Sequence, residues 1–227
     1  YSPFSMYFFN NSPICLIIYV YSLDKMKKEK LAYFAGGCFW CTEAVFQRVR
    51  GVDQIVSGYM GGTIKNPAYR EICTGRTGHA EGIRLVYDES IVRYKDLLHI
   101  FFATHDPTTL NRQGNDVGTQ YRSAIFYVDE EQKETAQNVM AALQASTFEA
   151  PIVTELLPEH PFYNAEDEHQ NYYNQHSDQM YCSYVISPKV AKLTQYFNCI
   201  HVAGGYPVEP IDVHSSIRHL KCIYEKL

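Results

Sequence analysis

One short stretch constrains this chain more than any other, because it places a cysteine where a strand gives way to a helix. The apolar residues 31–34 lead into Gly36 and Gly37, and Cys38 follows directly. Apolar residues then recur at helical spacing at Cys41, Ala44, Val45 and Val49. The pattern predicts a strand, a tight turn and a helix, with Cys38 in or beside the first helical turn. Unpaired backbone N–H groups and the helix dipole favour a thiolate at that position, so we predict that Cys38 is reactive.

Charge and composition exclude several classes of function. The 227 residues carry 20 basic and 25 acidic side chains, a net charge of −5, so nucleic acid is not an expected partner. A hydrophobic content of 46% is enough for a packed core. The apolar run at residues 14–21 is too short to span a bilayer, so we expect no membrane partner.

The order of predicted elements indicates one α+β domain with two extensions. Residues 1–25 lack the pattern of a signal peptide and precede Met26, a natural start, so we expect them to be dispensable. Residues 26–195 are expected to form the catalytic domain. Residues 196–227 show no long periodic run and are a candidate for disorder.

Within the domain, hydrophobic periodicity predicts an alternation of strands and helices. Strands are expected at 31–34, 52–60, 80–88 and 121–128, and helices from Cys38 to about Gly51, after Ser90 as far as about His105, and after Asp129. A further strand is expected at 152–157, a short helix or turn at 165–177, and extended chain from there to about residue 190. The order strand–helix–strand–strand–helix–strand predicts a split βαβ, ferredoxin-like two-layer sandwich with an extended C-terminal wrap. The polar loops 63–79 and 108–119 are expected at the end of the sheet that carries Cys38.

The cysteines indicate a working dithiol rather than a structural disulfide framework. Seven cysteines are scattered along the chain, which is typical of a reducing compartment, and we expect the cytoplasm. Cys38 and Cys41 are three residues apart, so on a helical turn their Cα atoms lie about 5 Å apart, within the range of a disulfide. Cys41 can therefore resolve an oxidised Cys38. The alternative resolving cysteines are Cys73, Cys182, Cys199 and Cys222.

Other side chains that could serve such a thiol lie close to it in sequence or in the polar loops. Phe39 and Trp40 could form an apolar box for a small uncharged group. Glu81 begins a predicted strand, and an apolar neighbourhood would raise its pKa and let it deliver a proton at neutral pH. Three further candidates, for hydrogen bonding, are Tyr69, Tyr121 and Asp116.

Neither a metal site nor a nucleotide-binding loop is predicted. His160, His169 and His176 fall in one region, but no H-E-x-x-H pattern is present to build a metal site there. The Gly-Gly pairs at 36–37, 61–62 and 204–205 form neither a GxGxxG motif nor a P-loop. We therefore expect a site that works without a cofactor.

Taken together, the motifs resemble those of a known enzyme family. Residues 36–41, Gly-Gly-Cys-Phe-Trp-Cys, resemble the active-site segment of the A-type peptide methionine sulfoxide reductases (MsrA). Further matching blocks follow in the family's order at 58–62, 67–73, 77–81, 105–108 and 111–123. The similarity covers about residues 30–190 and leaves out 1–25 and 196–227. An ordered set of blocks is far more specific than any one of them.

The resemblance implies an activity and a role for each matching residue. It implies reduction of the S epimer of methionine sulfoxide, free or in proteins, with thioredoxin as the reductant, and we expect a monomer. Cys38 matches the nucleophile and Cys41 the nearby resolving cysteine of one subgroup. The remaining matches are Phe39 and Trp40 for the methyl-binding box, Glu81 for the acid, Tyr69 and Tyr121 for the hydroxyl donors, and Asp116 for a polar residue that binds substrate or an ordered water.

Two other functions fit part of the pattern. A C-x-x-C at a helix start also suits a thioredoxin-like dithiol oxidoreductase, and a Cys38–Cys41 pair could act as a thiol switch in a binding module. Neither alternative has a use for the blocks that contain Glu81 and Asp116.

Overall fold

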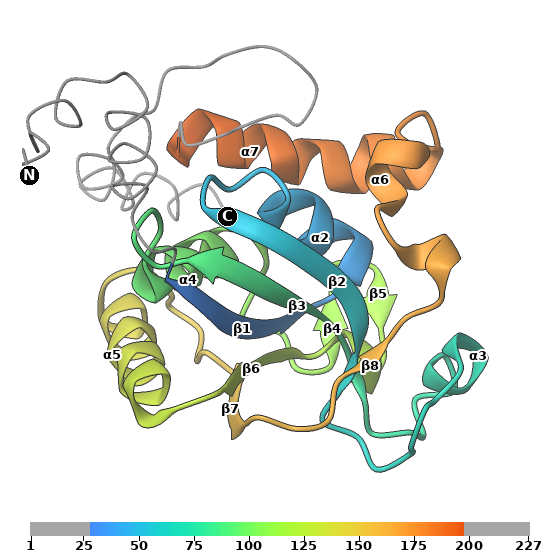
Figure 1. Cartoon of the computed structure of the whole chain (residues 1–227), viewed down its shortest axis with the longest axis horizontal. Coiled ribbons are helices and arrows are strands. Elements are labelled where there is room, and N and C mark those ends of the chain that lie inside the picture. The colour runs from blue at the N-terminus through green and yellow to red at the C-terminus, as the bar shows by residue number, and fades with distance from the viewer. Residues whose placement is uncertain (1–27, 198–227) are drawn as a thin grey trace, which may run out of the picture.

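The computed structural model describes residues 28–197 and shows a mixed α+β fold around one central sheet (Figure 1). The sheet strands are β1 (Glu29–Gly36), β2 (Val52–Met60), β3 (Ala80–Asp88), β6 (Ser123–Tyr127), β7 (Glu155–Pro158) and β8 (Tyr163–Asn164). A separate two-stranded hairpin consists of β4 (Arg112–Gln113) and β5 (Asp116–Val117). The helices are α2 (Phe39–Phe46), α3 (Tyr69–Ile72), α4 (Tyr94–Thr104), α5 (Glu130–Ser146), α6 (Tyr172–Gln175) and α7 (Ser187–Phe197).

The strand order is β7-β6-β1-β3-β2-β8. β3 lies between β1 and β2 and is antiparallel to both, and β6 is antiparallel to the other edge of β1. β7 adds to β6 in parallel and β8 adds to β2 antiparallel, so the chain between them reaches from one edge of the sheet to the other. Since β1 and β2 are joined through α2, this helix crosses one face of the sheet.

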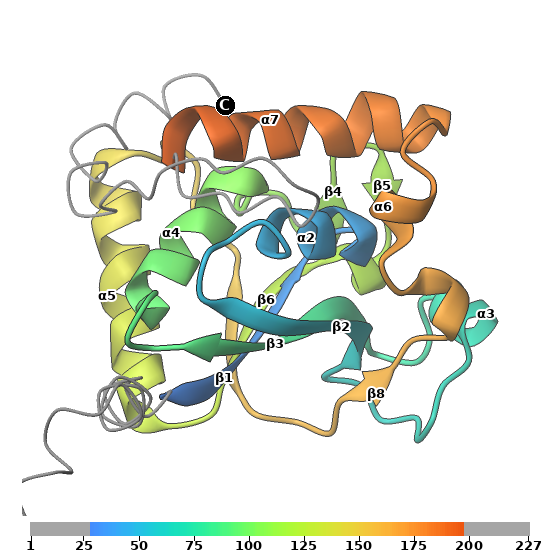
Figure 2. The same cartoon turned by 45° about the horizontal axis from the view of Figure 1, so that its top comes forward.

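Alternation along β1 divides the core between the two faces of the sheet. Phe34 points to the helical face and stacks on Phe46, Tyr94 and Phe101, with ring centroids 5.0–6.0 Å apart. Tyr33 points to the other face, where the segment that joins β7 to β8 covers it. On the helical face α7 lies across the outside of α2 and α4, so these two helices are packed between α7 and the sheet (Figure 2).

Several predicted boundaries differ from the structure for local reasons. β2 and β3 span the predicted residues, and Asp129 caps α5, accepting a hydrogen bond from the Gln132 N–H at 2.8 Å. The prediction that the first helix reaches Gly51 is wrong, because α2 ends at Phe46 and Gly51, with φ of +89°, lies in the turn before β2. α4 begins at Tyr94 rather than after Ser90.

Most of the expected extended chain from residue 178 to residue 190 is helical instead, from residue 180 onward. A helical stretch that includes a π-turn at Cys182–Ile186 continues directly into α7. Cys182, Ile186 and Leu193 are spaced 4 and 7 residues apart, and each is no more than 1% exposed. These side chains form a buried stripe, which stabilises a helix here despite the polar and aromatic residues between them.

Some expectations concern residues that the structure does not describe. Residues 1–25 and the part of the predicted tail from 198 onward, including Cys199 and Cys222, lie outside the described residues. Between residues 28 and 197, no helix has the length and apolar character needed to cross a membrane.

Candidate active site

The predicted strand–turn–helix around Cys38 is present. Cys38 is the N-cap residue of α2, 8% exposed, and Gly37 before it has φ of +88°. A Cβ atom on Gly37 would lie 2.6 Å from the side chain of Gln113, which packs over the turn. The turn therefore requires glycine for its backbone conformation and for the close approach of the hairpin residue.

Glu81 occupies the N-terminus of α2. It is the second residue of β3, 2% exposed, and its Oε2 accepts a hydrogen bond from the Phe39 N–H at 3.2 Å. Burial raises the pKa of Glu81 to about 8, and the nearby Asp116 and Cys41 contribute in the same direction. The Phe39 N–H opposes this rise only in part, so the carboxyl is mostly protonated at neutral pH.

Cys38 and Cys41 form a coupled dithiol. Burial raises the pKa of the Cys38 thiol, and its hydrogen bond with Cys41 adds to the rise. The same hydrogen bond lowers the pKa of Cys41 to about 6. Burial thus outweighs the predicted lowering of the pKa of Cys38 by the helix N-terminus, and at neutral pH the two thiols share one negative charge.

A tyrosine from the chain just before α7 links this dithiol to the hairpin. The Tyr181 hydroxyl donates a hydrogen bond to Asp116 Oδ2 at 3.0 Å and lies 3.8 Å from Cys41 Sγ. Asp116 is thus held beside the dithiol by a residue 65 positions away. Tyr121, in the 3-10 turn after the hairpin, packs against the same cysteine cluster.

Aromatic rings surround the thiols on the side of Phe39 and Trp40. Trp40 stacks on Tyr172 with centroids 3.7 Å apart and an interplanar angle of 5°. The ring of His169 lies 5.5 Å from Phe39 and 5.7 Å from Trp40. It also lies 4.3 Å from Tyr69, so the box is continuous from α2 to α3.

Three polar atoms in this box are buried without a hydrogen bond inside the described part of the chain. They are the indole N–H of Trp40 and both ring nitrogens of His169. Burial lowers the pKa of His169, so the ring is neutral at pH 7. An apolar box with unused donors is suited to a small molecule that is largely uncharged but has a hydrogen-bonding oxygen.

Sequence comparison identifies the family to which these residues belong. The family model described as peptide methionine sulfoxide reductase matches residues 30–200. The chain belongs to this family. A peptide methionine sulfoxide reductase MsrA of Deinococcus radiodurans is 58% identical over 170 residues, which are 74% of this chain and 82% of the relative. The MsrA of Ralstonia nicotianae is 55% identical over 181 residues, 78% of this chain and 95% of that protein.

Solved structures of the family share the fold. Reduced Mxr1 from Saccharomyces cerevisiae matches with a TM-score of 0.63 and 31% identity, over 70% of this chain and 91% of Mxr1. Methionine sulfoxide reductase A of Corynebacterium diphtheriae matches with a TM-score of 0.62 and 34% identity, over 81% of this chain and 84% of that protein.

Among the residues predicted for this reductase site, the structure brings the dithiol, the acid and the aromatic box together. It also adds Tyr172, Tyr181 and His169, which sequence reasoning did not assign to the site. Their only signal in the sequence is a cluster of aromatic residues between positions 169 and 184.

The other described cysteines lie in contrasting surroundings. Cys182 is fully buried in the apolar cluster that contains Cys38 and Cys41. Cys73 is exposed and interacts with the hydroxyl of Tyr69. Cys182 is therefore the alternative resolving cysteine that the fold places beside the dithiol.

The histidines do not assemble a metal site in the part of the chain that the structure describes. No group of three potential ligands is present between residues 28 and 197. The ring of His160 is hydrogen-bonded to the carbonyl oxygen of Pro158, and the ring of His176 stacks on Tyr172 with ring centroids 4.3 Å apart.

Proposed function

We propose that this chain reduces methionine S-sulfoxide, free or in proteins, to methionine, and that thioredoxin restores the enzyme. Its membership of the peptide methionine sulfoxide reductases supports this proposal. The observation that carries it is the pairing of a neutral buried carboxyl with a dithiol that holds one negative charge. Sulfoxide reduction needs a nucleophilic sulfur and a proton donor at one pH, and the pKa values of about 8 for Glu81 and about 6 for Cys41 provide both.

In the first step, Cys38 is the nucleophile. Its thiol passes its proton to the Cys41 thiolate along their shared hydrogen bond, and Cys38 Sγ then attacks the sulfoxide sulfur. Glu81 protonates the sulfoxide oxygen. This attack forms a bond between Cys38 Sγ and the substrate sulfur. That bond and the S–O bond of the substrate break as the protonated oxygen moves to Cys38, which leaves a sulfenic acid on Cys38 and releases methionine. Tyr69 and Tyr121 keep their protons at neutral pH, since burial raises the pKa of both, and they donate hydrogen bonds to the oxygen.

In the second step, Cys41 resolves the sulfenic acid. It first gives up the proton that it took from Cys38. The Cys41 thiolate then attacks Cys38 Sγ, the S–O bond breaks, and the hydroxide leaves as water with that proton. Thioredoxin, a dithiol, then reduces the Cys38–Cys41 disulfide and is itself oxidised. Cys182, buried in the same cluster, is the alternative to Cys41 among the described residues.

Phe39 and Trp40 select the methyl group of the substrate in this proposal. Trp40 is locked by its stack on Tyr172 and Phe39 by its contacts with Tyr59 and His169. Asp116, held by Tyr181, binds the polar part of the substrate or an ordered water. The chemistry uses side chains alone and calls for no cofactor.

The finer description of the fold and of the protein's setting belongs to the same proposal. The order β1-α2-β2-β3-α4-β6, with β3 between β1 and β2, supports a split βαβ, ferredoxin-like core. We assign catalysis to residues 26–195 and regard 1–25 as dispensable. We further propose that the enzyme acts as a monomer in the cytoplasm.

The test is dithiothreitol-driven reduction of the two sulfoxide epimers of a blocked methionine. We expect turnover of the S epimer and none by the Cys38→Ser variant. Absence of turnover with the S epimer would overturn the proposal. Reduction of insulin disulfides without any sulfoxide turnover would instead favour a thioredoxin-like oxidoreductase.

A further inference from the structure

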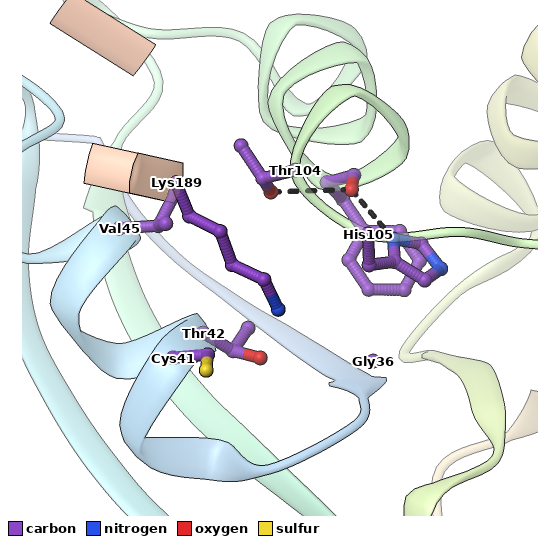
Figure 3. Close-up of a pocket in the computed structure, with 8 residues that line it drawn as sticks. Gly36, Cys41, Thr42, Val45, Thr104, His105 and Lys189 are labelled. Atoms are coloured by element: carbon purple, nitrogen blue, oxygen red, sulfur yellow. Dashed lines mark hydrogen bonds between the residues drawn. The ribbon is translucent and has the colours of Figure 1, made fainter. Parts of the chain in front are cut away.

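A small cavity lies on the side of Cys41 that faces α7 and the end of α4 (Figure 3). It encloses about 10 Å³, space for about one water. Its lining residues are Gly36, Cys41, Thr42, Val45, Phe101, Thr104, His105 and Lys189. Among these residues only Cys41 can carry a negative charge.

Lys189 is the cation of this cavity. It lies in the first turn of α7, is half-buried, and extends its ammonium group toward the turn of α2 that carries Cys41 and Thr42 (Figure 3). Within residues 28–197 it makes no ion pair with a carboxylate. A thiolate close to such an ammonium group is stabilised by its positive charge.

His105, the other titratable group in the lining, carries no charge. Its Nδ1–H donates to the carbonyl oxygen of Phe101 at 2.6 Å, and its Nε2 accepts from the Ser123 hydroxyl at 2.8 Å. Burial lowers the pKa of His105 to about 4, so the ring is neutral. The only group at this cavity that can balance Lys189 is the Cys41 thiolate.

We propose that Lys189 is a positioning residue whose charge holds the Cys41 side of the dithiol as a thiolate. This inference rests on the proposed function for its catalytic meaning. In that cycle the Cys41 thiolate attacks the Cys38 sulfenic acid. It is also the leaving group when the reductant's thiolate attacks Cys38 Sγ, because the Cys38–Cys41 bond then breaks with its electron pair on Cys41.

The other charged and titratable groups near Cys41 do not replace Lys189. Asp116 opposes the negative charge on Cys41, whereas Lys189 favours it. The hydroxyl of Tyr181 also favours it, but its hydrogen is donated to Asp116. The groups that face Cys41 from the surrounding elements are Cys38, Glu81, Asp116, Tyr181, Cys182, His105 and Lys189.

The experiment measures how fast iodoacetamide alkylates the reduced enzyme at each pH, with Cys38 and Cys41 distinguished by peptide mass spectrometry. We expect Lys189→Met to raise the lower apparent pKa of the pair by about one unit, so that alkylation at pH 5 slows by about tenfold. Lys189→Arg should restore the profile. Lys192→Met is the matched control, because Lys192 is also half-buried on α7 but does not line the cavity.

An unchanged profile for Lys189→Met, or an equal shift for Lys192→Met, would overturn the inference. If circular dichroism shows that Lys189→Met does not fold, Lys189→Gln replaces it with the same expectation. No sulfoxide is present in this assay, so its outcome is separate from that of the proposed function. A shifted profile in an enzyme without sulfoxide turnover would refute only the proposed function.

Discussion

Replacing Glu81 by glutamine tests whether this carboxyl is neutral in the folded enzyme. The side chain is 2% exposed, and its pKa is raised from 4.5 to about 8. The hydrogen bond from the Phe39 N–H is made to Oε2 at 3.2 Å, and the amide oxygen of glutamine can accept it equally well. The substitution therefore removes the ability to ionise and to act as an acid while the shape and this hydrogen bond remain.

The change in stability follows from the difference between the two pKa values. In the unfolded chain Glu81 ionises above its ordinary pKa of 4.5, whereas in the folded chain it stays protonated up to about pH 8. The free energy of unfolding of the native enzyme, compared with that of Glu81→Gln, is therefore highest below pH 4.5 and falls as the pH rises to 8. Each pH unit in this window costs about 1.4 kcal/mol, so at pH 7 the variant should be more stable by up to about 3 kcal/mol.

Urea unfolding at about pH 5 and pH 7.5 measures this difference, and the gap between the two proteins should widen with pH. In single-turnover reduction of the S-sulfoxide, the variant should be slower by about 10²–10⁴-fold, the usual contribution of a general acid. The native enzyme should lose activity above about pH 8, where Glu81 ionises, and the variant should not show this loss. Glu134→Gln, which removes an exposed carboxylate from α5, is the control. A gap that stays constant with pH would refute the assignment of a neutral Glu81.

Three further substitutions test other parts of the structure. Cys41→Ser should allow a first turnover, slowed because the thiolate that takes the Cys38 proton is gone, but stop recycling by thioredoxin; if recycling survives, disulfide mapping by mass spectrometry should identify Cys182, Cys199 or Cys222 as the partner of Cys38. Gly37→Ala should lower activity and the midpoint of thermal unfolding together, because the Cβ would meet the Gln113 side chain at 2.6 Å in a backbone with φ of +88°. Asp129→Ala should lower the free energy of unfolding by about 1 kcal/mol in urea titration without changing turnover, since it removes only the cap of α5.

The parts of this fold that sequence predicts well depend on neighbouring residues. The turn at Cys38 follows from two glycines between a strand and a helix, and β2 and β3 follow from alternation that ends at glycine or aspartate. The helical stretch from residue 180 to 190 could not be found this way. Its helix depends on burying Cys182 and Ile186 in the cluster with Cys38 and Cys41, and that packing brings together residues more than 140 positions apart.

The same limit explains which site residues were missed. Cys38, Phe39 and Trp40 are recognisable because they share one motif, and Glu81 because it opens a strand. Tyr172 and Tyr181 have no motif of their own, and their roles depend on the stack with Trp40 and the hydrogen bond to Asp116. Such contacts are properties of the tertiary structure and cannot be inferred from local spacing.

The pKa of Cys38 is raised, against the prediction, and the hydrogen bonds at the start of α2 show why. A cysteine at a helix N-terminus is usually expected to use the free N–H groups there. Here the Phe39 N–H donates to Glu81 and the Cys41 N–H donates to the carbonyl oxygen of Cys38, so those donors do not serve the thiol. The negative charge of the dithiol must then be stabilised from the opposite side, where Lys189 lies. The helix N-terminus holds the acid in place, and the reactive sulfur depends on its partner cysteine and on α7.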